Sequence, residues 1–292
     1  MNTVQSNVTL YSSKPRLCIR SQEHWYPYGI CYDKWNRHII VTDNWNSRIL
    51  IFDSNTYQSH SYFGSEGSEP GQFIGLQGLC IQPFTHYLLV CDPCNNRIQV
   101  LSNDDYSFIY QIGCKSKSEK KGQFDDPCGV CCDDKGHILV ADTSNDRIQE
   151  FNESGQFLNV YYTLLYDIEK IVDICYDKEY HRFLVADRWS SKIGIWSHDT
   201  CSKSRYISEI QLKNNCHCVY VDPLRNHQII IGTDHQVLVY DSRNHKEPIQ
   251  TLGSSRRGSE LDEFDYVTGI CVNEQDGSLI VVNRRNCRIQ IF

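Results

Sequence analysis

The sequence contains no stretch with helical periodicity and no apolar run long enough to cross a bilayer, so we predict neither a helical domain nor a membrane span. Its opening residues, MNTVQSNVTLYSS, lack the basic start and the apolar centre of a secretory signal. A Ser-His-Asp order, a phosphate-binding glycine loop and a low-complexity linker are also absent. We therefore expect a soluble, cytoplasmic chain with no membrane partner.

One pattern is present six times, about every 48 residues along the 292-residue chain. Its clearest copies start at Gly29, Gly129 and Gly269, where glycine precedes a short apolar run that is followed by a second and a third. Such runs, separated by Asp, Asn, Gly and Ser, are typical of strands and turns. Four antiparallel strands per copy form a propeller blade, whose faces are buried only when neighbouring blades pack against it. We predict an all-β, six-bladed β-propeller that occupies residues 1–292 as a single domain.

The two ends of the chain predict how the ring closes. The sixth copy ends at Phe292, directly after its third strand, so its fourth strand has to come from elsewhere. The segment at about residues 6–11, SNVTLY, is strand-like and precedes the first complete blade. We predict that it pairs beside residues 288–292, which would remove an open sheet edge.

An acid followed five positions later by a base recurs from blade to blade. The pairs are Asp43 with Arg48, Asp92 with Arg97, Asp142 with Arg147, and Asp187 with Lys192. Because the pattern recurs, we interpret each pair as a structural link between the second and third strands. Deleting one partner would cost about 3–5 kcal/mol if the pair is buried. The cost would be about 1 kcal/mol or less if the pair is exposed.

The fifteen cysteines do not form a convincing metal or disulfide pattern. Five of them occupy one equivalent position in different copies, two residues after the opening glycine or its replacement: Cys31, Cys80, Cys131, Cys175 and Cys271. Equivalent positions lie around a ring, too far apart to share an ion, and a small apolar side chain suits a crowded inner strand. We therefore predict structural packing at these positions, with no metal site and no cofactor.

The repeat resembles the NHL repeat over nearly the whole chain. The resemblance rests on the glycine-apolar opening, the V-x-D segment, the N-x-R-I or N-D-R-I continuation, and the G-Q-F segments at residues 71–73 and 122–124. The fourth copy departs from it, because Asp173 stands where other copies have glycine. In tripartite-motif and other RING-type proteins such a domain follows zinc-binding modules. The chain shows no such zinc pattern, so we expect a monomeric domain without ligase activity of its own.

Loops on one face of a propeller carry its variable residues, and these are our candidates for binding. Ring closure makes blades six and one neighbours, which predicts a basic and aromatic crescent there. The partner-binding candidates are Trp25, Tyr28, Trp45, Arg188, Trp189, Tyr266, Arg284 and Arg285, and the basic rim candidates are Lys115, Lys117, Lys120, Lys121, Arg256 and Arg257.

Three function classes follow from the resemblance and these residues. Related domains bind proteins as the partner arm of RING-type ubiquitin ligases, and some bind single-stranded RNA. Exposed Trp, Tyr and Arg suit either partner. The net charge of −7 favours a protein over RNA and disfavours DNA. Some six-bladed propellers are metal-dependent lyases or lactonases, but here only Asp173 and His217 could contribute ligands at the central channel. We therefore predict a non-catalytic protein-binding scaffold, with RNA binding as the alternative.

Overall fold

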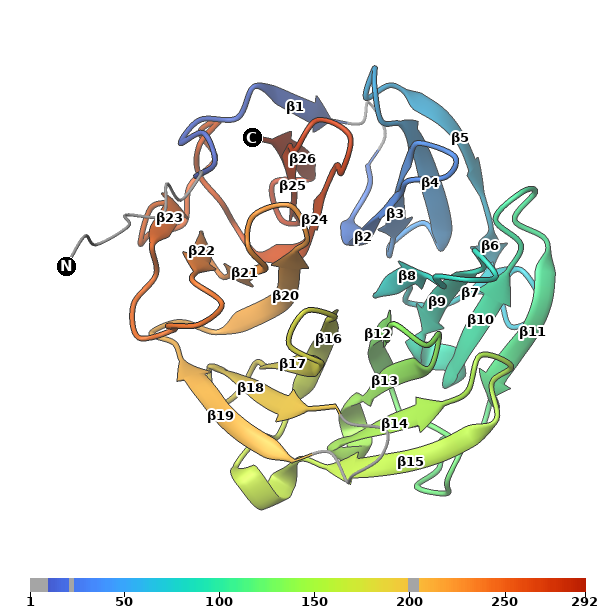
Figure 1. The fold of residues 1–292 in the computed structure, drawn as a ribbon. Helices are drawn as coiled ribbons and strands as arrows, with labels where there is room; N and C mark the ends of the chain where they lie inside the picture. Colours follow the sequence, from blue (N-terminus) through green and yellow to red (C-terminus); the bar gives the residue numbers. More distant parts are fainter. Residues whose placement is uncertain (1–9, 21–23, 199–204) are drawn as a thin grey trace.

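The computed structural model describes residues 10–20, 24–198 and 205–292. Within these residues, six four-stranded antiparallel sheets stand around a central axis, as Figure 1 shows. The first strand of each sheet lies nearest the axis and contacts the first strands of its neighbours, whereas the fourth strand lies at the rim. The predicted all-β, six-bladed propeller is confirmed.

The blades follow one another in chain order. Blade one comprises β2 (Pro27–Asp33), β3 (His38–Asp43), β4 (Arg48–Asp53) and β5 (Ser59–Phe63). Blade two comprises β8 (Leu79–Ile81), β9 (Leu88–Asp92), β10 (Arg97–Leu101) and β11 (Phe108–Gly113). Blade three comprises β12 (Pro127–Cys132), β13 (Ile138–Asp142), β14 (Arg147–Phe151) and β15 (Phe157–Tyr162). Blade four comprises β16 (Ile171–Asp177), β17 (Arg182–Asp187), β18 (Lys192–Ser197) and β19 (Tyr206–Gln211). Blade five comprises β20 (Cys216–Asp222), β21 (Gln228–Thr233), β22 (Gln236–Tyr240) and β23 (Gln250–Gly253). Blade six comprises β24 (Val267–Val272), β25 (Leu279–Asn283), β26 (Arg288–Ile291) and β1 (Leu17–Arg20). Shorter elements are the parallel pair β6 (Ser65–Glu66) and β7 (Gln72–Phe73), and the single turns η1 (Pro93–Asn95), η2 (Thr143–Asn145) and η3 (Leu164–Tyr166).

The hydrophobic core lies between adjacent blades. The second and third strands are buried along their whole length in blades two and three, because a neighbouring blade covers each face. One core cluster, for example, joins Leu89 and Val100 of blade two to Val130 and Val140 of blade three. The outer strand β15 instead has only exposed and half-buried side chains, as expected for a strand with one face in solvent.

Ring closure occurs, but not with the predicted segment. The strand that completes blade six is β1, which pairs antiparallel with β26 from Leu17 opposite Ile291 to Arg20 opposite Arg288. Of the predicted residues 6–11, residues 6–9 lie outside the described part of the chain, and residues 10 and 11 form no strand.

Tyr11 explains why the strand-like pattern was misleading. Its backbone N–H donates to Gln250 Oε1 at 3.0 Å, and its buried hydroxyl donates to Asp222. The guanidinium of Arg225 lies 4.2 Å from its ring centroid. The ring, hydroxyl and backbone of Tyr11 therefore attach this segment to blade five. The alternating pattern of residues 6–11 did not indicate pairing with blade six.

The recurring Asp and Arg pairs form in blades one to three. The distance from the arginine Nε to the carboxylate is 3.1 Å for Arg48, 2.8 Å for Arg97 and 2.7 Å for Arg147. In blade four the predicted pair is wrong, because Lys192 Nζ contacts Glu209 on the outer strand at 3.3 Å. A lysine amine is a single point charge without the forked geometry of arginine, so the nearer outer carboxylate satisfies it.

Each pair also holds the loop that leads into its blade. In blade two, Asp92 Oδ1 accepts the N–H of Ile74 at 2.8 Å, and Arg97 Nη2 donates to the carbonyls of Glu69 and Gln72. In blade six the acid is replaced by Asn283, whose Oδ1 still accepts the N–H of the lead-in loop at 2.9 Å. The pairs therefore anchor the loops of one face as well as linking two strands.

Candidate functional site

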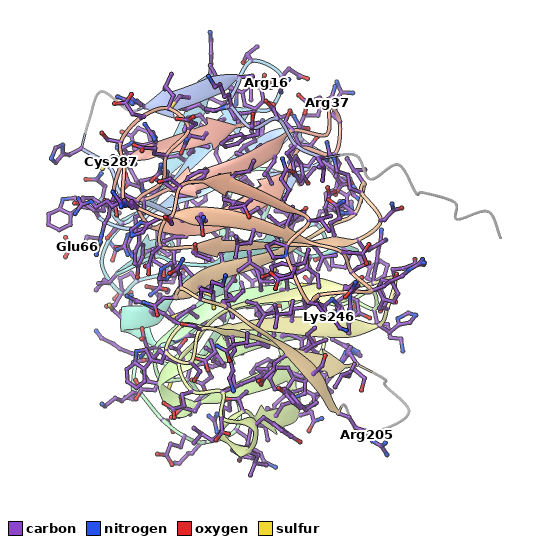
Figure 2. All side chains as sticks on the ribbon, turned by 90° about the vertical axis from the view of Figure 1, so that its left-hand side faces the viewer. Arg16, Arg37, Glu66, Arg205, Lys246 and Cys287 are labelled. Atoms are coloured by element: carbon purple, nitrogen blue, oxygen red, sulfur yellow. The ribbon has the colours of Figure 1, made fainter. Side chains whose placement is uncertain are left out.

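The candidate binding residues lie on one face of the disc, which we call the loop face. It is formed by the loops between second and third strands and by the lead-in loops. Figure 2 shows the disc edge-on, with Cys287 from the β25–β26 loop and Glu66 from a lead-in loop at one side. Arg37 and Lys246, which lie in turns at the opposite ends of the strands, point to the other side.

Tyr266 is the centre of the densest group of functional side chains on the loop face. The guanidinium carbons of Arg188, Arg284 and Arg285 lie 5.2, 5.7 and 4.9 Å from its ring centroid. The imidazole of His217 stacks on the same ring at 3.9 Å. The backbone of Tyr266, at φ +71°, donates its N–H to the carbonyl of Asp234 and accepts the N–H of Arg284. Blades four, five and six thus meet at one buried tyrosine.

Arg284 extends this group to blade one. Its guanidinium carbon lies 4.8 Å from the ring centroid of Tyr28 and 6.0 Å from that of Tyr26. Tyr26 in turn lies 6.0 Å from Trp45, which is 72% exposed. We call Tyr26, Tyr28, Arg188, Tyr266, Arg284 and Arg285 the Arg–Tyr cluster.

The electrostatics of the cluster favour an anionic ligand. Burial raises the pKa of the Tyr28 and Tyr266 phenols, so both stay neutral. Burial also lowers the pKa of His217, whose Nε2 lies 2.8 Å from Asp234. Among the described residues, Arg284 Nε is a buried nitrogen donor with no hydrogen-bond partner. The group thus combines the guanidinium groups of Arg188, Arg284 and Arg285 with two nearby carboxylates, those of Asp234 and Asp265.

Trp25 is a predicted site residue that the structure places in the core. It is only 1% exposed, packs on Phe52 and donates its Nε1–H to the carbonyl of Cys287 at 2.8 Å. Trp25 directly precedes Tyr26, whose N–H donates to the carboxylate of Asp43 in blade one. The residues that precede the equivalent N–H donor in other blades are all buried: Phe73, Phe124, Ile168 and Phe264. Trp25 thus replaces the phenylalanine of G-Q-F, and this register was readable from the sequence.

The other predicted site residues are more dispersed than the crescent implied. Trp189 is 69% exposed beside Arg188. The rim bases Lys115, Lys117, Lys120, Lys121 and Arg256 are exposed on lead-in loops. Arg257 joins the site differently, because its Nε lies 2.6 Å from the buried Asp265, which Arg285 also approaches at 3.7 Å. The sequence did not single out Tyr26 or Asp265, since adjacency across blades is not visible in a linear repeat.

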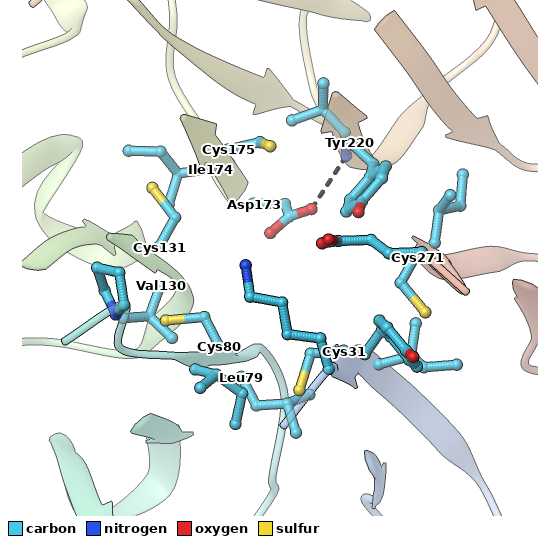
Figure 3. Close-up of a pocket in the computed structure, with 18 of the residues that line it drawn as sticks. Cys31, Leu79, Cys80, Val130, Cys131, Asp173, Ile174, Cys175, Tyr220 and Cys271 are labelled. Atoms are coloured by element: carbon cyan, nitrogen blue, oxygen red, sulfur yellow. Dashed lines mark hydrogen bonds between the residues drawn. The ribbon is translucent and has the colours of Figure 1, made fainter. Parts of the chain in front are cut away.

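The central channel opens on the opposite face into a cavity of about 300 Å³. Figure 3 shows Asp173 within it, accepting the N–H of Val219 at 3.0 Å. Burial raises the pKa of Asp173 to about 7. Toward the loop face the channel narrows and continues as a second cavity of only about 40 Å³, whose lining includes Asp173 and His217. A Cβ on Gly29 would lie 2.3 Å from the carbonyl oxygen of Gln77, so glycine lets the inner strands approach this closely.

The five equivalent cysteines line this cavity, one from each of blades one, two, three, four and six. In blade five the corresponding side of the cavity is occupied by Tyr220. Burial raises the pKa of the thiols of Cys31, Cys131, Cys175 and Cys271, to about 12 for Cys175, so these four thiols are protonated at neutral pH. In the narrow part of the channel, His217 contacts Asp234, and Asp173 accepts the backbone N–H of Val219. Among the described residues that line the narrow part of the channel, Asp173 and His217 are the carboxylate and imidazole side chains.

The NHL repeat model matches residues 25–52, 124–151 and 264–292. These ranges cover the first three strands of blades one, three and six. A curated relative, the B-box type zinc finger protein ncl-1 of Caenorhabditis elegans, is 51% identical over 37 residues. That match covers 13% of this chain and 4% of the relative, so the chain corresponds to a small part of that protein.

Two solved structures share the fold across the chain. A putative gluconolactonase matches with a TM-score of 0.70 and 11% identity, covering 94% of this chain and 91% of its own. A streptogramin B lyase matches with a TM-score of 0.63 and 13% identity, covering 94% and 96%. At these identities the likeness concerns the fold alone. No helix among the described residues is long and apolar enough to cross a membrane. The chain therefore contains NHL repeats, and they lie within a six-bladed β-propeller.

Proposed function

We propose that this protein is a non-catalytic recognition scaffold whose Arg–Tyr cluster binds an acidic segment of a protein partner. The observation that carries the proposal is the convergence of three guanidinium groups on Tyr266, with Arg284 Nε buried and without a hydrogen-bond partner among the described residues. Arginine binds carboxylates with two parallel hydrogen bonds, and Arg and Tyr are the residues that most often anchor protein interfaces.

The charge distribution favours a protein over a nucleic acid. The net charge is −7, and a buried acid, Asp265, lies directly beside Arg257 and Arg285. A nucleic acid would need a broad basic surface to offset repulsion along its backbone. A single carboxylate side chain needs only the local field of the cluster.

Single-stranded RNA is the second candidate, and two exposed tryptophans favour it. Trp45 and Trp189 lie on loops that flank the cluster and could each stack a base, worth about 1–3 kcal/mol. The arginines would then contact phosphates.

The wider role rests on family analogy. NHL-repeat domains act as the partner-binding arm of RING-type ubiquitin ligases, and the short match to a B-box type zinc finger protein supports a role of that kind. Under this proposal the domain acts as a monomer in the cytoplasm. A lyase or lactonase activity is the remote alternative. The folds of the two solved structures support it, and among the described residues Asp173 and His217 are the carboxylate and imidazole that line the narrow part of the channel.

Selection from a display library of disordered peptides, with the purified protein as bait, tests the proposal. We expect enriched peptides to contain Asp or Glu, and their affinity to fall at least about 30-fold when Arg284 and Arg285 are both replaced by alanine. The matched control is Arg243→Ala in the β22–β23 loop, which should leave binding unchanged. Binding of a short RNA pool at low salt, lost in the same double variant while peptides show no enrichment, would favour RNA. Binding of neither class would refute the scaffold proposal.

A further inference from the structure

A second cluster of functional side chains lies away from the loop face, where blade three meets blade four. It consists of Asp133 in the β12–β13 turn, His137 just before β13, Glu150 on β14 and His198 just after β18. One ligand atom from each residue lies within 4.8 Å of the other three. The side chains of Asp133, Glu150 and His198 are each more than nine-tenths buried.

Four of the six distances between these atoms are close to the edge length of a metal coordination tetrahedron, and the other two are within 4.8 Å. His137 Nδ1 lies 3.0 Å from Asp133 Oδ2 and 3.4 Å from Glu150 Oε1. His198 Nε2 lies 3.1 Å and 3.7 Å from the same two oxygens. Four ligands at zinc bond lengths are separated by about 3.3–3.4 Å when the ion is tetrahedral.

Glu150 breaks the repeat at this place. The residues at its position in the third strands of the other blades are all aliphatic: Ile51, Val100, Ile195, Val239 and Ile291. A buried carboxylate in place of an aliphatic side chain costs several kcal/mol unless it is paired. The blade therefore carries an acid where its fold needs none, which points to a ligand.

The link between blades does not require all four residues. Blade one makes the equivalent connection with Asn103 Nδ2 donating to Asp33 Oδ2 at 2.7 Å, and blade six makes it with Asn273 Nδ2 donating to the carbonyl of Ser54 at 3.2 Å. His198 beside Asp133 would be enough to link blades three and four. His137 and Glu150 are additional, and both face the same centre.

Neighbouring groups hold the ligand atoms in place. The backbone N–H groups of Lys135 and His137 donate to Asp133 Oδ1 at 2.9 and 2.7 Å, which leaves Oδ2 facing the two imidazoles. The hydroxyl of Tyr161 donates to Glu150 Oε2 at 2.5 Å, which leaves Oε1 facing them. Such outer contacts are typical of metal sites, where they orient the ligands.

We propose that Asp133, His137, Glu150 and His198 form a zinc site that joins blade three to blade four. Two carboxylates neutralise a dication, and two imidazoles with two oxygens suit zinc in a four-coordinate site. Since all four positions are taken by protein, the site is structural. Its role is to brace the ring on the side opposite the Arg–Tyr cluster, and it is independent of what that cluster binds.

The test compares zinc binding by the whole chain and by Glu150→Gln, after both have been treated with a chelator, loaded with zinc and desalted. Elemental analysis should find about one more zinc per chain in the unaltered protein. Zinc should raise its unfolding temperature but not that of Glu150→Gln. Cobalt should produce the visible absorption of a tetrahedral ion without thiolate charge-transfer bands, which separates this site from the cysteines.

Two further variants guard against misfolding and non-specific effects. Glu150→Ile restores the residue type of the other blades, so it should fold without metal and still lack the extra zinc. His38→Asn changes a histidine at the position in blade one that corresponds to His137, and it should bind zinc like the unaltered protein. Equal zinc contents in the unaltered protein and Glu150→Gln, or cobalt bands from thiolates alone, would overturn the proposal.

Discussion

Blades two and three differ from blade six in the loop between the second and third strands. In blades two and three, Arg97 and Arg147 are buried, and each binds an aspartate together with carbonyls of its lead-in loop. In blade six, Arg288 at the equivalent position also binds carbonyls of its lead-in loop, whereas the loop before it carries Arg284 and Arg285, which surround an aromatic ring. In a repeat protein, residues that recur brace the scaffold, and residues that depart from the repeat are the candidates for function.

The same rule applies to the two faces of the disc. On the loop face the departures are the members of the Arg–Tyr cluster, which come from blades four, six and one. On the opposite face the departure is Glu150, within a blade that is otherwise regular. Four changes test whether recurrence separates structure from function in this way.

The largest effect is expected from Trp25→Ala. The side chain fills the lead-in position that is buried in the other blades and donates a hydrogen bond to the carbonyl of Cys287, so its loss should cost near the upper end of about 3–5 kcal/mol of unfolding free energy. Trp45→Ala, at an exposed loop position, should cost less than about 0.5 kcal/mol. Urea unfolding of both variants measures the difference, and similar losses would mean that register does not distinguish core from surface tryptophans.

A similar loss is expected from Arg147→Ala, about 3–5 kcal/mol, because Asp142 would remain buried without its partner. Arg285→Ala should change stability by less than about 0.5 kcal/mol, since its side chain is 55% exposed compared with 4% for Arg147. The same urea titration compares them. A large loss for Arg285 would assign it to the scaffold and remove it from the candidate site.

Asp173→Asn tests the one acid at the inner glycine position. The pKa of Asp173 is raised to about 7, so the unfolded chain releases this proton from about pH 4 while the folded chain retains it. The stability of the unaltered protein should therefore fall between about pH 4 and pH 7, by the order of a few kcal/mol. The asparagine variant lacks this loss and can still accept the Val219 N–H. Unfolding free energies measured at pH 4.5 and pH 8 should show that the stability of Asp173→Asn relative to the unaltered protein rises with pH. An equal dependence on pH in both proteins would contradict the raised pKa of Asp173.

The smallest effect is expected from Lys192→Ala. Its partner Glu209 lies on an outer strand and is partly exposed, so the loss should be about 1 kcal/mol or less. Thermal unfolding beside Arg147→Ala gives the comparison. A loss as large as that of Arg147 would show that blade four keeps the conserved pair in solution.

The errors of sequence reasoning have particular physical causes. Trp25 was assigned to the surface because its residue type suits binding, although its register with the G-Q-F segments predicts burial. Residues 6–11 were assigned to the closing strand from their pattern alone. An alternating pattern indicates extended chain but not its pairing partner, and that strand proved to be β1, from Leu17 to Arg20.

The sequence by itself determined the number of blades, the order of their strands and the residues that recur to brace them, because a repeat encodes each blade locally. Only the tertiary structure decided which departures from the repeat come together. Tyr28 and Arg284 meet because the ring closes, and Glu150 and His198 meet because neighbouring blades pack. Contacts between blades depend on the curvature of the whole ring, which no single repeat contains.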